Sequence, residues 1–243
     1  MKFSFSLSKL SVFFILVIPF LIIHSVSSLN LTNEYINHKC LFNQGKYRSG
    51  SKYEENLNRA FNVMRDNTYA ETGFTDTDIG TSPDSVTIVS QCRGDTYGSK
   101  CHTCLDVAVA GLRKRCPWNK GRIIWYDQCF IYITTTGVEV PYRTDYKNMF
   151  SIHNHNNVRG DVKLFTNRAM DFFSELTLKA EKHVYDGFGL IYYAAGEKKL
   201  GKNKLYAMVQ CLGLTLDCTS CLTVSVKKLF ENGNIKQGAR IWV

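Results

Sequence analysis

Two similar cysteine motifs, far apart in the chain, constrain this sequence more than any other feature. The first, QCRGDTYGSKCHTCL at residues 91–105, holds three cysteines in a C-x8-C-x2-C spacing. A shorter copy, QCLGLTLDCTSCL at residues 210–222, has a C-x6-C-x2-C spacing. Because a repeated segment of this kind marks a repeated structural unit, we predict two similar domains.

The N-terminal residues have the three regions of a secretory signal peptide in order. Two lysines, Lys2 and Lys9, precede an apolar run at residues 10–23, and small residues follow it at 26–28. We predict that residues 1–28 are a signal peptide and that Leu29 begins the mature protein. A membrane anchor is the alternative, but the run is short for a span of about 20 residues and Pro19 interrupts it. The protein is expected to be secreted, with no transmembrane segment after cleavage.

The chain is basic, with a formal net charge of +9. Removal of residues 1–28 takes away two lysines and no acidic residue, which leaves about +7 by the same counting. Outside the cell, this charge favours acidic polysaccharide or phospholipid surfaces over nucleic acid. The basic residues are spread along the chain, apart from short clusters at 113–115 and 198–204, which is more typical of solvated faces than of one binding patch.

The first copy shows helix and strand patterns before its motif. Ser51 and Glu54 have capping-box spacing, and apolar residues then recur at helical intervals: Leu57, Ala60, Phe61 and Met64. Gly73–Asp84 is rich in Thr, Asp, Gly and Pro, which predicts turn and loop. Ser85–Cys92 is β-branched and alternating, so we predict a strand that leads into the motif.

A second helix and further β structure follow the motif. The helical spacing after it places Cys101 and Cys104 in the first helical turn and Cys116 at the helix end. Gly121–Thr136 predicts one long strand, or two strands joined near residues 127–128. The small size and the sulfur content favour an antiparallel α+β domain over a parallel α/β unit.

The second copy follows a polar, irregular stretch at residues 138–159, which we interpret as a linker. Leu164–Ala180 has a wide apolar stripe and predicts a helix with a core-facing side. Gly187–Ala195 and Lys204–Cys211 are predicted to form a hairpin with GEKKLGKN as its turn, and another helix begins at Cys218.

The register between the copies shows where they differ. A shift of 117 residues carries Cys101 to Cys218 and Cys104 to Cys221, but it would carry Cys129 to position 246, beyond Val243. The second copy also has no counterpart of Cys40. We expect a first domain at residues 29–137 and a second, C-terminally incomplete domain at residues 160–243.

The expected secretion decides how the cysteines are interpreted, because extracellular thiols pair with one another. The first copy has six cysteines, which allow 15 pairings, and spacing does not choose among them. Two alternatives are a redox C-x-x-C at Cys101 and Cys104, and a zinc site made by these two residues with Cys116 and Cys129. The signal peptide argues against both, so we expect no metal and no cofactor.

The sequence resembles the plant cysteine-rich repeat secretory proteins in several features. These are the first motif, the Gln-Cys pair that opens it, the helix after it, the segment CPWNKGRIIWYDQCF and the tandem arrangement. These proteins are built of ginkbilobin-type, or stress-antifungal, domains, and the resemblance covers nearly all of Leu29–Val243. It implies an antiparallel sheet of five strands with two helices in each domain. It also implies four disulfides: Cys40–Cys116, Cys92–Cys101, Cys104–Cys129 and Cys211–Cys218. Cys221 is left over, which in a secreted chain indicates a free thiol, an intermolecular bond or an incomplete sequence.

Some members of that family bind mannose-type sugars and act against fungi. The resemblance implies a site made by an Asn, an Arg and a Glu, at positions that hold Leu41, Ile123 and Thr134 in this chain. None of these can make the charged, donor-rich contacts that orient a sugar. Arg122 is adjacent to the Arg position, but neighbouring strand residues point to opposite faces. In the second copy Arg240 occupies the matching Arg position, but the Asn and Glu of the site are missing. Arg240 is the candidate ligand-binding residue, although we favour a surface or structural role for it.

We therefore expect a secreted, non-enzymatic recognition or defence protein of the plant apoplast that lacks the mannose site. The expected partners are cell-wall or microbial glycans or an extracellular protein. The alternatives are an assembly protein, dimeric through Cys221 or through an open sheet edge, and a carbohydrate-binding antifungal lectin. Asn30, in the only N-x-S/T sequon, is the candidate glycosylation site. No catalytic residue is expected, because recognisable nucleophile or carboxylate partners are lacking for His102, His153, His155 and His183.

Overall fold

The computed structural model describes residues 33–67, 73–135, 148–181, 184–185, 190–200, 203–213, 217–231 and 235–242. Residues 34–243 form one compact unit, which contains both repeats. The expected signal peptide, Asn30, His183 and the first part of the expected linker, residues 138–147, lie outside the described residues. In the part of the chain that is described, no helix is both long and apolar enough to cross a membrane.

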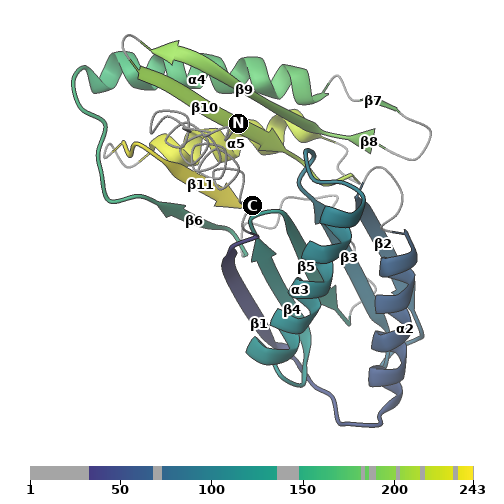
Figure 1. Ribbon diagram of the computed structural model, residues 1–243. Coiled ribbons are helices and arrows are strands. Elements are labelled where there is room, and N and C mark those ends of the chain that lie inside the picture. The colour runs from purple at the N-terminus through teal and green to yellow at the C-terminus, as the bar shows by residue number, and fades with distance from the viewer. Residues whose placement is uncertain are drawn as a thin grey trace, which may run out of the picture. The chain divides into compact units, whose positions relative to one another are not determined.

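The first repeat is a five-stranded antiparallel sheet with two helices packed on one of its faces (Figure 1). The strand order is β1-β4-β5-β3-β2, so β5 is central and β1 and β2 form the edges. The elements are β1 (Tyr35–Lys46), α2 (Lys52–Asn67), β2 (Phe74–Ile79), β3 (Val86–Cys92), α3 (Ser99–Arg115), β4 (Asn119–Tyr126) and β5 (Cys129–Thr134). This is the α+β architecture that the sequence predicted. After the motif the chain forms two strands joined at residues 127–128, which is the second of the two predicted alternatives.

Helix α2 begins where the capping box predicted. Ser51 Oγ accepts a hydrogen bond from the Glu54 N–H at 3.3 Å, and the Glu54 carboxylate accepts one from the Gly50 N–H at 2.7 Å. The apolar stripe of α2 is buried against the sheet together with residues of α3 and alternate residues of β3, β4 and β5. The central positions of this core are Leu57, Phe61, Ile88, Leu112, Ile124, Ile131 and Ile133.

The structure has three disulfides in the first repeat, Cys40–Cys116, Cys92–Cys101 and Cys104–Cys129, and one in the second, Cys211–Cys218. They are the four pairs that the resemblance implied. The first links the edge strand β1 to the C-terminal end of α3, and the third links α3 to the central strand β5. Cys221 belongs to none of the four and is half-buried.

Strand β2 corrects the prediction of turn and loop for Gly73–Asp84. Phe74–Ile79 pairs antiparallel with β3 along its whole length. Its FTDTDI sequence is unusual for a strand, but β2 is an edge strand, and Asp76 and Asp78 point to solvent. Charged residues are common on sheet edges because they discourage pairing with another chain.

The second repeat has two helices and three two-stranded sheets among its described residues. The sheets pair β11 with β6, β10 with β9, and β7 with β8. The elements are β6 (Phe150–His153), α4 (Val162–Glu181), β7 (Val184–Tyr185), β8 (Leu190–Ile191), β9 (Tyr193–Leu200), β10 (Asn203–Gln210), α5 (Cys218–Phe230) and β11 (Ala239–Trp242).

Two details of the second repeat differ from the sequence predictions. Phe150–His153, expected in the linker, forms β6 and pairs with β11, which lies more than 80 residues later in the chain. Local composition does not encode such a long-range contact. The predicted hairpin is present as β9 and β10, but Gly196–Leu200 continues β9, so the turn is shorter than GEKKLGKN. Alternate charged residues in this hairpin point to solvent. Their polar character made this part of the strand look like a turn in the sequence.

The core of the second repeat lies between its helices and the β9–β10 hairpin. The α4 stripe is buried as predicted, at Ala169, Phe172, Leu176 and Ala180. It packs with α5 and with alternate residues of β9 and β10, among them Ala194, Val209 and Leu222. No residue of β11 belongs to this core cluster, as far as the described residues go.

Candidate functional site

The three positions of the implied sugar site fall on one face of the first sheet. Their neighbours in the strands point toward the helices: Cys40, Ile124 and Ile133. Because side chains alternate along a strand, Leu41, Ile123 and Thr134 point to the opposite face. Ile123 and Thr134 are buried there and Leu41 is half-buried. The structure thus brings the three positions to one face but supplies only two hydrocarbon side chains and one buried hydroxyl.

Arg122, which the sequence places beside the implied arginine position, is completely buried on the helix side of the sheet. Its Nη1 donates to the Cys116 carbonyl oxygen at 3.3 Å, and its guanidinium carbon lies 5.6 Å from the centre of the Tyr47 ring. Neither Nε nor Nη2 has a hydrogen-bond partner among the described residues. Burial raises the pKa of the Tyr53 phenol in the same region, against the opposing charge of Arg122. Arg122 therefore belongs to the core and does not face a ligand on the other side.

We expect the bulk of Arg122, and not its charge, to stabilise the first repeat. Arg122→Met should leave the free energy of unfolding within about 1 kcal/mol of the parent or raise it, because a buried charge without full pairing carries a desolvation cost. Arg122→Ala should lower it by about 2–4 kcal/mol through the cavity it leaves. Urea unfolding of the two variants compares them directly. Equal destabilisation by methionine and alanine would show that the guanidinium itself holds the core.

A polar cavity of about 680 Å³ opens at the end of the first sheet where β1, β5 and the β2–β3 connection come together. Its lining comes from four separate segments of the chain: Gln44, Asp78, Gly80, Thr81, Ser82, Pro83, Ser85, Lys120 and Thr135. Thr135, which lines the cavity, directly follows Thr134, one of the three implied sugar positions, in the chain. Sequence analysis did not find it, because its residues share no motif and only the sheet brings them together.

Several polar groups of this cavity are already hydrogen-bonded to one another. Gln44 Oε1 accepts from the Thr135 N–H at 3.0 Å, and Ser85 Oγ donates to the Thr135 carbonyl oxygen at 2.6 Å. Lys120 Nζ donates to the Pro83 carbonyl oxygen at 3.0 Å and lies 3.8 Å from Asp84. Hydroxyl, amide, ammonium and carboxylate groups thus share one opening, and several of them already have hydrogen-bond partners within the protein.

Arg240 lies on β11 and forms an ion pair with Asp127, in the connection between β4 and β5 of the first repeat. Asp127 also accepts from Arg93 Nη1 at 2.8 Å, and Arg93 Nε donates to Asp95 at 2.6 Å. Burial opposes the charge of Arg93, but hydrogen bonds to both carboxylates raise its pKa overall. The arrangement supports the structural role that we favoured for Arg240.

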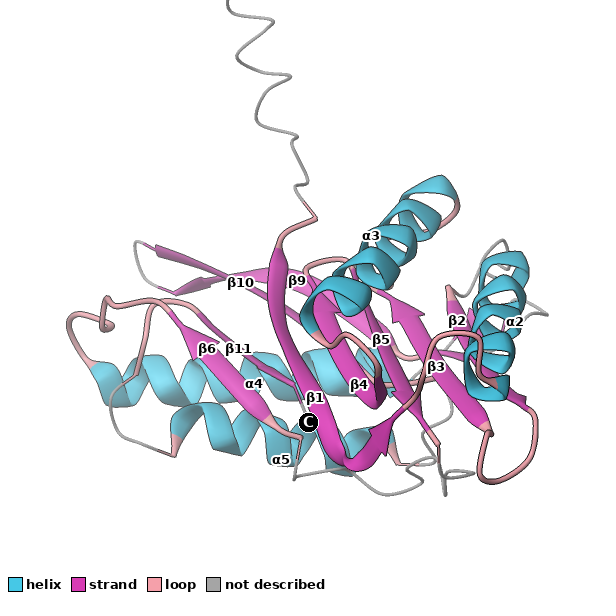
Figure 2. Cartoon of the chain, turned by 90° about the horizontal axis from the view of Figure 1, so that it is seen from below, coloured by secondary structure: helices cyan, strands magenta, loops and turns pink. Residues whose placement is uncertain are grey.

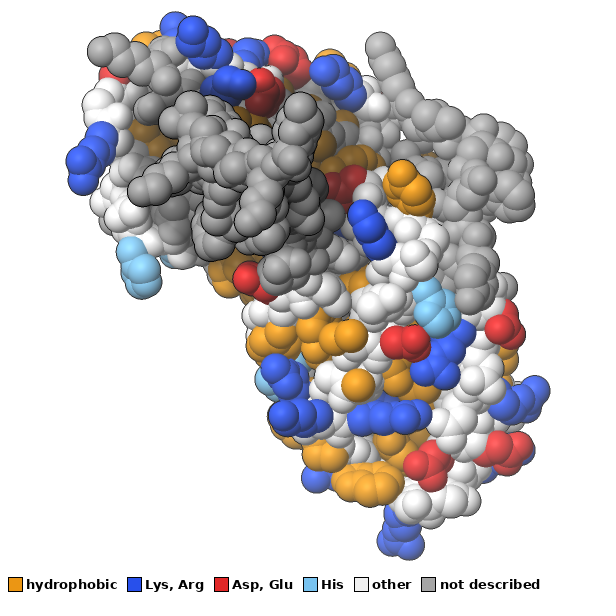
Figure 3. Space-filling view, in the orientation of Figure 1, with side chains coloured by type: hydrophobic (Ala, Val, Ile, Leu, Met, Phe, Trp, Pro, Cys, Tyr) orange, Lys and Arg blue, Asp and Glu red, His pale blue; other side chains and the backbone are white. Residues whose placement is uncertain are grey.

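Basic side chains on the first repeat lie among other groups. Figure 3 shows Lys and Arg interspersed with apolar and acidic side chains over this repeat, not gathered into one block. The Arg115 guanidinium lies 3.8 Å from the centre of the Tyr35 ring, and Lys120 Nζ lies 4.9 Å from that of Tyr53. Such contacts are ordinary for solvated basic residues.

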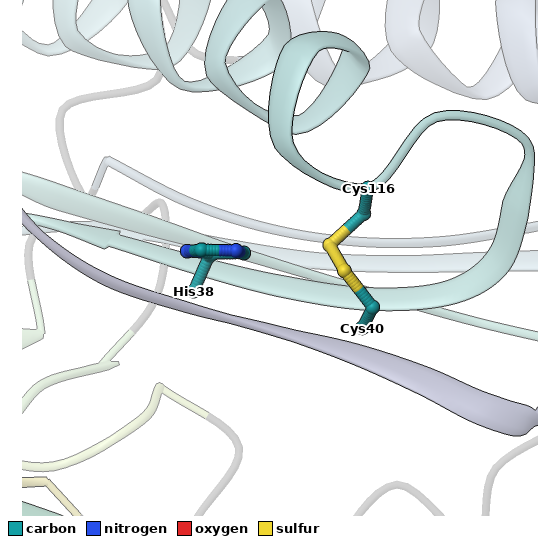
Figure 4. Close-up of side chains that lie close together, drawn as sticks. All are labelled: His38, Cys40 and Cys116. Carbon is teal, nitrogen blue, oxygen red and sulfur yellow. A yellow bond between two sulfur atoms is a disulfide. The ribbon is translucent and has the colours of Figure 1, made fainter.

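The sulfur atoms that could suggest a metal or redox site are in disulfides. His38, Cys40 and Cys116 lie together with their ligand atoms within 4.8 Å of one another, but Figure 4 shows the two cysteines bonded to each other. Cys101 and Cys104 are bonded to Cys92 and Cys129, and not to each other. Disulfide sulfur carries no thiolate charge, so these residues are neither zinc ligands nor a redox C-x-x-C in this state.

One histidine does have a carboxylate partner, which corrects the sequence analysis. His102 Nδ1 lies 3.3 Å from Asp106, one helical turn along α3. Asp106 also accepts from Arg65 Nε at 2.8 Å, and both members of the pair are partly exposed. His153 and His155 are exposed. An i,i+4 pair on a helix surface is a common local interaction and by itself is not a catalytic arrangement.

The two repeats are joined by a reciprocal exchange between their Gln-Cys pairs. Gln91 Nε2 donates to the Cys211 carbonyl oxygen at 3.1 Å, and Gln210 Nε2 donates to the Cys92 carbonyl oxygen at 2.8 Å. Each glutamine oxygen accepts from a glycine two residues after the opposite cysteine, at Gly213 and Gly94. We call these two side chains the glutamine clamp. It gives the Gln-Cys-x-Gly sequence of each repeat a role that its local pattern does not reveal.

Aromatic packing accompanies the clamp. The Phe150 ring lies 4.7 Å from Trp125 of the first repeat and is stacked on Trp242 at 4.7 Å. Gly94 is needed where the backbone approaches Tyr193, because a Cβ there would collide with the base of that side chain. The sheet face that includes Ile123 is therefore occupied in part by the second repeat.

Comparisons with known proteins agree with this architecture. The family described as salt stress response/antifungal matches residues 39–136. Cysteine-rich repeat secretory protein 32 of Arabidopsis thaliana is 51% identical over 238 residues, which cover 98% of this chain and 92% of that protein. Protein 35 of the same series and organism is 48% identical over 242 residues, with the same coverage.

Solved structures show the same fold at lower identity. The tandem DUF26 ectodomain of the Arabidopsis thaliana cysteine-rich receptor-like protein PDLP8 has a TM-score of 0.69 at 23% identity, and the match covers 87% of this chain and 94% of that one. The corresponding ectodomain of PDLP5 has a TM-score of 0.65 at 21% identity, with 86% and 94% covered. Both are tandem domains, as are the two repeats described above.

Proposed function

The chain belongs to the plant cysteine-rich repeat secretory proteins, and on this basis we propose that it is a non-enzymatic recognition protein of the apoplast without the mannose site of its sugar-binding relatives. The carrying observation is the composition of that site. Leu41, Ile123 and Thr134 share the correct face but present no charged group and no exposed donor. A sugar needs several converging polar groups to be oriented, and these positions cannot supply them.

A non-enzymatic role is supported by the chemistry of the remaining groups. The cysteines of the first motif are in disulfides, and the His102–Asp106 pair lies on a helix surface. Neither arrangement holds a nucleophile beside a base in a closed site, which is what most covalent or acid–base mechanisms require. The fold thus serves as a scaffold, and its surfaces carry the recognition.

The polar cavity that Lys120 and Thr135 help to line is the surface that best suits a glycan ligand. It combines a lysine ammonium, hydroxyls and amide groups within one opening. Cell-wall and microbial glycans have the hydroxyl density to exchange hydrogen bonds with such a lining. A carbohydrate-binding antifungal role would fit this cavity as well, with contacts different from those of the mannose-binding relatives.

A glycan array probed with the secreted protein tests this proposal. We expect no signal for mannose oligosaccharides above that of an unrelated secreted protein. If another glycan class binds, Lys120→Ala should weaken that binding at least about tenfold, since it removes a charged donor from the cavity. Arg240→Ala is the matched control and should leave such binding unchanged. Strong mannose binding that Arg240→Ala abolishes would overturn the proposal.

An assembly role is the second candidate, and it is favoured by the unpaired edges of the second repeat. In the described residues, β10 and β11 each pair with one strand only. The sequence also suggested a covalent dimer through Cys221. That residue lies half-buried in the first turn of α5.

A further inference from the structure

The tryptophan between α3 and β4 has an unusual backbone conformation. Trp118 has a φ of 65°, and among the described residues it is the only non-glycine residue with a positive φ. Bulky side chains rarely adopt this left-handed region, and Gly or Asn forms such a turn with less strain. Strained residues of this kind cluster at ligand-binding and active sites, so the conformation indicates a role for the Trp118 ring beyond forming the turn.

The Trp118 ring is supported from within the protein and still open to solvent. Its centre lies 5.5 Å from that of the Tyr47 ring in an edge-on arrangement, and the Tyr47 ring lies 5.1 Å from that of Tyr53. Tyr53 is completely buried and Tyr47 is half-buried, whereas Trp118 is 46% exposed. Core packing therefore does not account for the whole ring, which presents an aromatic surface to solvent.

The loop that carries Trp118 is fastened at several points. Cys116 is bonded to Cys40 of β1, and its carbonyl oxygen accepts from the Asn119 N–H at 3.4 Å. The Trp118 carbonyl oxygen accepts from the Tyr47 N–H at 2.9 Å. The α3–β4 and β1–α2 connections thus lie together at one end of the first sheet (Figure 1), and α2 and α3 cover the same side of that sheet (Figure 2). A preformed surface of this kind loses little conformational freedom on binding.

Basic side chains lie on the segments around Trp118. Lys46 is opposite Asn119 where β1 pairs with β4, Arg48 follows two residues later, and both are exposed. Lys114, in the last turn of α3, is exposed as well. In the part of the chain that the structure describes, none of these three basic residues forms an ion pair with an acidic side chain. Their positive charge therefore favours an anionic ligand.

We propose that Trp118, together with Lys46 and Arg48, binds an acidic polysaccharide. One sugar ring would lie on the tryptophan, because its C–H groups pack on the electron-rich face of an aromatic ring. Carboxylates of neighbouring uronic acid units would pair with the two basic side chains. We call these three residues the Trp118 platform. It goes beyond the proposed function, because it specifies an acidic glycan and uses side chains that do not line the polar cavity.

An anionic membrane is the other ligand that an aromatic ring beside basic residues could bind. Surfaces that insert into membranes usually present several apolar side chains on one face. Within residues 46–52 and 116–120, Trp118 is the only exposed large apolar side chain. Exposed polar residues such as Arg48 and Ser49 follow Tyr47 in the chain. A single ring among polar groups suits one sugar of a polysaccharide better than the acyl chains of a lipid.

Binding of a galacturonic acid oligomer to the full secreted chain, measured by calorimetry, tests the proposal. We expect saturable binding that also protects Trp118 from quenching by acrylamide. Trp118→Asn removes the ring but tolerates the left-handed backbone, so the protein should stay folded while binding weakens at least about tenfold. Trp118→Tyr keeps an aromatic face and should retain most of the binding. Tyr206→Asn is the matched control, because it removes an aromatic ring that is 69% exposed on β10, and it should change nothing.

The methyl ester of the same oligomer separates charge from stacking. It keeps every sugar ring but has no carboxylates, so it should bind at least about tenfold more weakly. Lys46→Gln with Arg48→Gln should weaken binding of the acidic oligomer and reduce its dependence on salt. Lys163→Gln with Arg168→Gln, at two exposed basic residues of α4, is the control and should do neither.

Equal binding of the esterified oligomer, unchanged binding in Trp118→Asn, or no binding at all would overturn the Trp118 platform. So would binding to vesicles of anionic phospholipid that Trp118→Asn abolishes, in the absence of binding to the oligomer. A ligand of the polar cavity behaves in the opposite way, since it should be lost in Lys120→Ala and kept in Trp118→Asn. None of these outcomes bears on the mannose site, so this proposal and the proposed function fail independently.

Discussion

Replacing both Cys40 and Cys116 with alanine is expected to lower the free energy of unfolding of the first repeat by about 4 kcal/mol. This disulfide closes a loop with a sequence separation of 76 residues, the longest of the four. In the chain-entropy treatment, a longer loop restricts the unfolded chain more and so stabilises the folded state more. Urea unfolding followed by tryptophan fluorescence measures the change, because Trp118 and Trp125 both lie in this repeat.

The Cys211–Cys218 disulfide provides the matched control. Its sequence separation is 7 residues, and its removal should cost about 2 kcal/mol by the same reasoning. The predicted order of the two effects is the informative result. A larger loss from the short bridge would mean that native contacts around it, and not loop closure, determine its contribution.

Replacing both members of the glutamine clamp with leucine is expected to weaken the contact between the repeats by about 2–4 kcal/mol. Gln91→Leu with Gln210→Leu removes four hydrogen bonds and leaves backbone groups of Cys92 and Cys211 without these partners. An unsatisfied buried polar group costs about 1–3 kcal/mol, and solvent that enters the seam will recover part of this. The second repeat should then unfold at a lower urea concentration than the first, in place of a joint transition.

Hydrogen exchange of the amides in β10 and α5 follows the effect of the clamp on the second repeat. Gln237→Leu is the control, because Gln237 is exposed and its Nε2 contacts the Asn157 carbonyl oxygen within the same repeat. It should leave the exchange rates almost unchanged. Unaltered exchange in the clamp variant would mean that the other contacts between the repeats, such as Phe150 with Trp125 and Arg240 with Asp127, hold them together without the clamp.

Most of the secondary structure was predictable from local patterns. The apolar spacing after Ser51 and after Cys104 predicted α2 and α3, and β-branched runs predicted β3, β4 and β5. Two incorrect predictions, those for β2 and β6, share a cause. Strands β2 and β6 are short, polar segments whose pairing partners supply the reason for their conformation, and composition alone makes such segments look like loops.

For the implied sugar site, the sequence predicted only which polar groups are missing. The residues at the implied sugar positions could be read from the sequence, and with them the missing charged groups. The polar cavity could not be, because Gln44, Ser85, Lys120 and Thr135 are brought together by the strand order of the sheet.

The sequence by itself determined the repeated architecture, the α+β class and the positions at which sulfur could fasten it, because these depend on periodicity and spacing within each repeat. Only the tertiary structure decided that Gln91 and Gln210 exchange hydrogen bonds, that Arg240 pairs with Asp127 and that one sheet face is covered by the other repeat. The physical reason is separation along the chain. The glutamine contacts and the ion pair join residues more than 100 positions apart, and a pairing of that range is set by how whole layers pack.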